Sequence, residues 1–102
     1  MKRILIRYKT KPDRAEENEA LVAKVFQQLR QRAPAGIRYA SVKLADGATF
    51  VHLVEIDTKD GSNPLSEIDA FKAFQKDIKD RCAEQAQASD VTVVGNYRLF
   101  GD

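Results

Sequence analysis

The chain has 102 residues, 43% of them hydrophobic and 31% charged, with a net charge of +2 at neutral pH. This length and composition predict one globular domain over residues 1–102 and exclude a disordered chain. A single cysteine excludes an intrachain disulfide and a cysteine-built metal site, and no apolar stretch approaches the ~20 residues of a membrane span. No secretory signal follows Lys2 and Arg3, so we expect a cytoplasmic protein without a membrane partner.

In chain order, the first predicted strand covers Arg3 to Lys9, and Lys11-Pro12-Asp13 ends it. Asp13 and Glu16 then have the spacing of a D-x-x-E pair that caps a helix. The helix has one apolar stripe at i, i+3 and i+4 spacing, and Pro34-Ala35-Gly36 stops it. The stripe consists of Leu21, Val22, Val25, Phe26 and Leu29.

A second strand is predicted over Arg38 to Leu44 and a third over Ala48 to Ile56, joined by a tight turn at Asp46-Gly47. Asn63-Pro64 or Ser66 opens a second helix. Its inward stripe comprises Ile68, Phe71, Phe74 (or Gln75) and Ile78.

We expect this second helix to fade through the polar, alanine-rich segment Ala83 to Ser89. The last strand is predicted to begin at Val91 and to run towards Leu99, with a bulge near Gly95. The order β-α-β-β-α-β with right-handed crossovers gives an α+β, ferredoxin-like fold. Its four-stranded antiparallel sheet carries both helices on one face and has the first and third strands in its centre.

The third strand is apolar on both faces. Because side chains alternate along a strand, Phe50, Val54 and Ile56 share one face with His52. Val51 and Leu53 share the other face with Glu55, and the helices of so small a domain cannot cover both. Single-stranded RNA is a poor occupant of the open face, because Ala48 and Leu53 stand where stacking aromatic residues would be needed. The pattern favours a second copy of the chain.

Four segments give the chain a family resemblance: Arg7 to Asp13, the acidic start of the first helix, Phe50 to Glu55, and Asp69 to Phe74. With them the chain resembles the dimeric α+β barrel superfamily and, within it, the antibiotic biosynthesis monooxygenase-like domains. The resemblance implies a homodimer with the two sheets face to face and a cavity on the helix side of each subunit. It also implies a choice of activities, among them cofactor-independent oxygenation of quinol-type aromatic molecules.

Members that degrade heme have an asparagine, a tryptophan and a heme-ligating histidine where this chain has Ile6, Leu65 and Gln75. Ile6 cannot form the asparagine's hydrogen bonds, and Gln75 is a poor ligand for iron. Heme degradation is therefore not expected, and no cofactor or metal is predicted.

His52 is the candidate catalytic residue, as the only side chain that titrates near neutral pH unaided. In the cavity it would remove a proton from a phenol, which then reacts with dioxygen. A histidine with its hydrogen bonds satisfied at the dimer interface is the alternative. Tyr8, Tyr39, Phe71, Phe74 and Gln75 are candidate substrate-binding residues, although aromatic residues at such positions also serve simply as core.

Glu55 lies among apolar neighbours, so it must be paired or have a raised pKa. We expect an ion pair with Arg7 on the adjacent strand. The leading hypothesis is a homodimer that binds, and oxidises, a small aromatic molecule. The alternative is a non-catalytic dimer, either small-ligand-binding or stress-related, and nucleic-acid binding is not expected.

Overall fold

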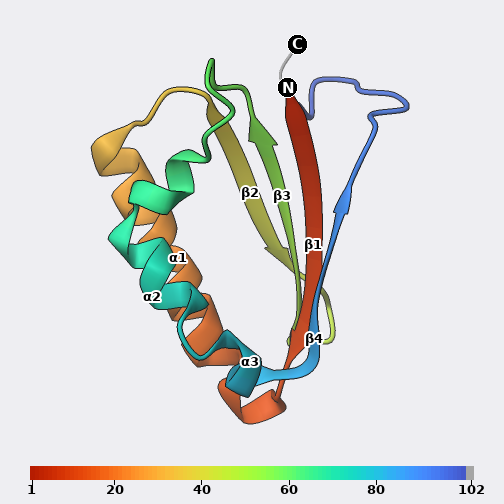
Figure 1. Cartoon of the computed structure of the whole chain (residues 1–102). Helices are drawn as coiled ribbons and strands as arrows, with labels where there is room; N and C mark the ends of the chain where they lie inside the picture. The colour runs from red at the N-terminus through yellow and green to blue at the C-terminus, as the bar shows by residue number, and fades with distance from the viewer. Residues whose placement is uncertain (101–102) are drawn as a thin grey trace.

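The computed structural model describes residues 1–100. Its strands pair antiparallel in the order β2-β3-β1-β4, and they are β1 (Lys2–Thr10), β2 (Ile37–Lys43), β3 (Thr49–Ile56) and β4 (Cys82–Asp90). The α-helices are α1 (Ala15–Arg32), α2 (Asp69–Gln75) and α3 (Ile78–Arg81), and all lie on one side of the sheet (Figure 1). The predicted ferredoxin-like α+β fold is confirmed, with the first and third strands in the centre of the sheet.

The hydrophobic core lies between the helices and the sheet. Val22 and Val25 of α1 and Phe74 of α2 pack against Tyr8 and Phe50 of the central strands. Strand alternation sends every second residue of β3 into this core, as the sequence predicts. Among residues 1–100, no helix covers the opposite face of the sheet (Figure 1).

Both predicted helices differ in detail from the sequence expectation. Pro12–Arg14 forms a 3-10 turn, so α1 begins after Arg14 and the D-x-x-E cap at Asp13 does not form. The second helical segment opens at Asn63, whose side chain accepts a hydrogen bond from Leu65 N. It is broken at Asp77, whose φ of 63° is left-handed, and this break separates α2 from the single turn α3.

The last strand was placed wrongly by the sequence pattern. β4 is Cys82–Asp90, the segment expected to fade as helix, and β-pairing ends just after it, where Val91 N donates to Arg3 O. Alanine, glutamate and glutamine favour helices, but the free edge of β1 offers backbone hydrogen bonds that outweigh this preference. The bulge predicted near Gly95 is also misplaced. The irregularity lies in the pairing of β1 with β4, where the register shifts on both sides of Lys9.

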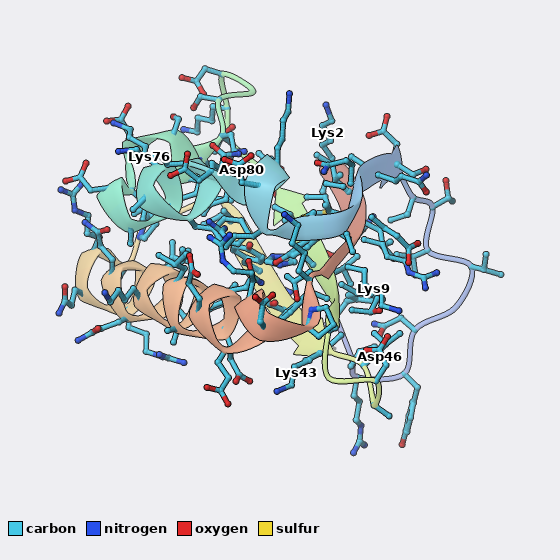
Figure 2. All side chains as sticks on the ribbon, turned by 90° about the horizontal axis from the view of Figure 1, so that it is seen from below. Lys2, Lys9, Lys43, Asp46, Lys76 and Asp80 are labelled. Atoms are coloured by element: carbon cyan, nitrogen blue, oxygen red, sulfur yellow. The ribbon has the colours of Figure 1, made fainter. Side chains whose placement is uncertain are left out.

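The β2–β3 turn forms where Asp46-Gly47 predicts it. Gly47 has a φ of +76°, and Asp46 Oδ1 accepts hydrogen bonds from the backbone N–H groups of Ala48 and Thr49. Figure 2 shows Lys9 and Asp46 together at this end of the molecule, with Nζ and Oδ2 4.0 Å apart. The turn fixes the pairing of β2 with β3, and with it the positions of the side chains described next.

Candidate functional site

A cavity of about 250 Å³ lies between the sheet and the α2–α3 segment. It brings together the residues named from the sequence, namely His52, Tyr8, Tyr39, Phe71, Phe74 and Gln75, although their roles stay predictions. Ile6, Ile78 and Ala86 complete its wall. Phe74 is buried while Gln75 is exposed, so Gln75 lies where the cavity meets solvent.

His52 occupies the middle of β3, faces the helices, and is only 2% exposed. Tyr8 Oη is 2.8 Å from its Nε2, and Tyr39 Oη is 2.5 Å from its Nδ1. Ser41 Oγ, on the paired strand β2, is a more distant neighbour at 3.4 Å from Nε2. Burial lowers the pKa of His52 to about 4, so the imidazole is neutral at pH 7.

The two tyrosines reach His52 from the strands on either side of β3. Tyr8 on β1 stacks on Phe50, with ring centroids 5.5 Å apart, and Tyr39 on β2 packs against Phe26 of α1 at 4.8 Å. Burial raises the pKa of Tyr8 to about 12 and also raises the pKa of Tyr39. Both phenols therefore keep their protons at neutral pH and offer hydroxyl groups, not charges.

The polar cluster continues away from the cavity through residues that sequence reasoning missed. Asn18 of α1 is fully buried, and its Nδ2 donates to Tyr8 Oη at 2.8 Å. Arg81, 1% exposed at the end of α3, donates from Nε to Asn18 Oδ1 at 3.2 Å. Its other nitrogens donate to the carbonyls of Phe74 and Lys76 at the C-terminus of α2, where the helix dipole favours a cation.

A faint signal for Asn18 was present in the sequence. It lies three and four residues before Leu21 and Val22, so the helical period places a polar side chain on the apolar stripe. Arg81 gave no such signal, because the last strand was expected to begin only at Val91.

The predicted ion pair of Arg7 with Glu55 is wrong. Glu55 is buried and pairs with Arg3, whose Nε lies 2.8 Å from Oε2. The strand register explains the change, because Arg3 stands directly opposite Glu55 on β1 whereas Arg7 stands opposite Val51.

A second, larger hollow of about 370 Å³ lies on the open face of the sheet. Its walls are mostly apolar, and Leu99 and Phe100 of the C-terminal segment close one side. The apolar strand residues there are Leu5, Ala40, Val42, Val51 and Leu53. Its polar lining residues are Arg38, Tyr39 and Glu55, but the Tyr39 hydroxyl is hydrogen-bonded to His52 on the helix side.

Within residues 1–100, no group of three or more histidine, cysteine, aspartate or glutamate side chains is placed to bind a metal ion. No helix in this range combines the length and apolar character needed to cross a bilayer.

Comparison with known proteins supports the fold. No family model matches the chain, and no curated protein matches it in sequence. A solved structure described as an antibiotic biosynthesis monooxygenase is similar with a TM-score of 0.74 and 14% identity, covering 93% of this chain and 100% of that one. A variant of SnoaB, a cofactor-independent oxygenase from Streptomyces nogalater, gives 0.64 and 14%, covering 93% and 94%.

A protein of unknown function from Nitrosomonas europaea is similar to the same degree, with a TM-score of 0.71 and 12% identity over 94% of this chain and 91% of that one. The chain therefore has the fold of the antibiotic biosynthesis monooxygenase-like domains, as the sequence resemblance implies. At these identities the likeness concerns the fold and leaves the activity open.

Proposed function

We propose that this protein is a homodimeric monooxygenase-like protein that binds a small phenol or quinol-type molecule in the helix-side cavity and oxidises it without a cofactor. The observation that supports it is the cluster of His52, Tyr8 and Tyr39 at the wall of that cavity. Neutral hydroxyl groups around an apolar space suit an uncharged aromatic molecule that carries hydroxyl or carbonyl oxygens.

In the proposed reaction, a tyrosine hydroxyl accepts the phenolic proton and passes its own proton to His52. The electron-rich phenolate then transfers an electron to dioxygen, and the radical pair combines to form a carbon–oxygen bond. The proton held by His52 returns to the resulting peroxide, and loss of water then leaves a quinone. One oxygen atom of dioxygen enters the product and the other leaves as water, so a phenol and dioxygen give a quinone and water. The protein supplies the proton acceptor and the exclusion of solvent.

Dimerisation through the open face belongs to the same proposal. Val42 is 56% exposed, and it shares this face with the partly exposed residues Leu5, Val51 and Leu53. Burying ~600 Å² of apolar surface per subunit would contribute roughly 15 kcal/mol before the costs of association. The helix-side cavity lies on the far side of the sheet, so dimerisation would leave it open to ligands.

A non-catalytic ligand-binding protein is the second candidate, and one observation favours it. Both ring nitrogens of His52 already have tyrosine partners, so the imidazole has no free nitrogen for a substrate. A phenol would therefore contact the tyrosines and not the imidazole itself.

Oxygen uptake with a panel of hydroquinones and naphthols separates the two candidates. We expect uptake by the wild type, and a loss of at least tenfold in kcat/KM for His52→Gln and Tyr8→Phe. Tyr97→Phe, a change at an exposed tyrosine outside both cavities, is the matched control and should leave kcat/KM unchanged. Binding of the same molecules without uptake would support the non-catalytic candidate and reject catalysis.

A further inference from the structure

A continuous chain of buried hydrogen bonds joins the helix-side cavity to Arg81. From the cavity it passes through Tyr39, His52, Tyr8 and Asn18, with each link between 2.5 and 3.2 Å. Every buried side-chain nitrogen or oxygen in the described part of the chain has a hydrogen-bond partner. The direction of each bond can therefore be worked out from its fixed end.

Arg81 is that fixed end, because a guanidinium group only donates hydrogen bonds. The Asn18 atom that faces Arg81 Nε must then be the carbonyl oxygen Oδ1. This leaves the amide nitrogen Nδ2 facing Tyr8 Oη, to which it donates. The orientation of the Asn18 side chain thus follows from the position of Arg81.

The same logic carries through to His52. Since Tyr8 Oη accepts a hydrogen bond from Asn18, its own proton is free to be donated to His52 Nε2, 2.8 Å away. A neutral imidazole has one protonated nitrogen, so the proton of His52 lies on Nδ1 and is donated to Tyr39 Oη. The reverse arrangement would leave the buried Tyr8 hydroxyl proton without an acceptor.

We propose that Asn18 and Arg81 are positioning residues that hold His52 in the Nδ1-protonated tautomer and thereby give the two tyrosines different roles. Tyr8 Oη becomes the site that accepts a proton from the ligand, because Tyr8 can pass its own proton to the lone pair of His52 Nε2. Tyr39, which already accepts from Nδ1–H, keeps its own proton to donate into the cavity.

The two roles suggest a class of ligand, an inference that rests on the proposed function. A molecule with a hydroxyl group to donate to Tyr8 and a second oxygen to accept from Tyr39 satisfies both sides of the cavity. Hydroxynaphthoquinones, and hydroquinones in which one of the two hydroxyl groups is converted to an ether, have this pattern. A ligand with a carboxylate would meet no fixed cation on the cavity wall, because Arg81 lies behind Asn18 and Phe74.

The tautomer can be read directly by NMR, because His52 is the only histidine in the chain. In protein labelled with ¹⁵N-histidine, one ring nitrogen of a neutral imidazole resonates as protonated and the other as unprotonated. At pH 7 and without ligand, we expect Nδ1 to be the protonated nitrogen in the wild type. A protonated Nε2, or an averaged mixture of both tautomers, would overturn the proposal.

Asn18→Asp provides the reversal test. The carboxylate accepts from Arg81 and also accepts from Tyr8 O–H, which turns the Tyr8 proton away from His52. Nε2 must then carry the imidazole proton, so the protonated resonance moves from Nδ1 to Nε2. Ser41→Ala, which removes only the 3.4 Å neighbour of Nε2, is the matched control and leaves Nδ1 protonated.

An unchanged tautomer in a folded Asn18→Asp protein would reject the role of Asn18. If that variant does not fold, the wild-type spectrum still decides the tautomer. No substrate enters these measurements, so failure to find oxygenase activity leaves the result standing. Conversely, a protonated Nε2 would reject the roles of Asn18 and Arg81 without deciding the proposed oxidation, which oxygen uptake tests separately.

Discussion

The two faces of β3 differ in the kind of interaction they offer. On the helix side, His52 lies in a buried network where each hydrogen bond has a definite partner and direction. On the open side, Val51 and Leu53 present a partly exposed apolar surface with one ion pair, Arg3 to Glu55, at its edge. Burial of polar groups demands exact partners, whereas burial of apolar area demands only a complementary surface.

In the proposed function, the single strand β3 contributes to a ligand site and to a dimer interface without conflict. Because side chains alternate along β3, the proposed ligand site and the proposed dimer interface lie on opposite faces of the strand. Substitutions on the two faces should therefore affect different measurements: those on the open face the oligomeric state, and those on the helix side stability and ligand binding.

Leu53→Glu should abolish the proposed dimer. An isologous interface would contain the new carboxylate twice, and burial of like charges would raise the dissociation constant about 1,000-fold, or about 4 kcal/mol. Sedimentation at micromolar concentration would change from twice the 11.5 kDa chain mass to the single chain mass. Gln27→Glu, which adds the same charge at an exposed position of α1, should stay dimeric; equal behaviour of the two variants would contradict the open face as the interface.

Arg81→Met should destabilise the fold by about 3 kcal/mol, because it leaves Asn18 Oδ1 and the carbonyls of Phe74 and Lys76 without their donors. Urea unfolding at a fixed chain concentration measures this loss. Arg30→Met removes an exposed arginine from α1 and should change the free energy of unfolding by less than about 0.5 kcal/mol. Similar losses in both variants would mean that the buried network contributes little to stability.

The free energy of unfolding should decrease as the pH is lowered, over a range set by the titration of His52. Its pKa is about 4 in the folded protein against 6.5 when unfolded, so between these values the unfolded chain binds more protons. The contribution of neutral His52 to the free energy of unfolding is fully present above pH 6.5. As the pH falls to 4, this contribution is lost, which lowers the free energy of unfolding by on the order of 3 kcal/mol. The groups that face the ring, Tyr8 and Tyr39, do not titrate there, because their pKa values are raised.

His52→Gln removes this titration. Urea unfolding of both proteins across pH 4 to 7 should show a slope for the wild type that the variant lacks. Parallel pH dependences would place the titrating group elsewhere, among the carboxylates.

Tyr39→Phe should weaken the binding of a phenolic ligand about fivefold, the loss of one neutral hydrogen bond of about 1 kcal/mol. Calorimetric titration measures this, with Tyr97→Phe as the control at an exposed tyrosine. The dimer should be unaffected, because Tyr39 presents its hydroxyl to the helix side. A change in oligomeric state would contradict the separation of the two faces.

The sequence was a good guide wherever strong alternation specified a surface. The faces of β3 follow from Phe50 to Ile56, and the central place of β1 and β3 follows from the element order. The residues around the cavity could be named for the same reason, since Tyr8, Tyr39 and His52 all point to the buried face of adjacent strands. Their hydrogen bonds could not be predicted, because they depend on rotamers and on distances across the sheet.

The sequence misled where composition and tertiary context disagree. The residues of β4 from Ala83 to Asp90 are exposed, so no apolar pattern marks the segment as a strand. Val91 to Val94 have strong β-propensity but lie beyond the sheet, and Val94 is 100% exposed. Misplacing this strand also hid Arg81, which ends α3 directly before β4 and closes the polar network.

We propose that the helix-side cavity, and not the open face, receives the ligand. NMR titration of ¹⁵N-histidine, methyl-labelled protein with a hydroxynaphthoquinone tests it, because the cavity carries His52, Ile6 and Ile78 while the open face carries Leu5 and Leu53. We expect saturable shifts of the His52 ring nitrogens and of the isoleucine methyl groups, with the leucine methyl groups unchanged. Shifts confined to the leucines, or none at all across the panel of phenols and quinols, would contradict it.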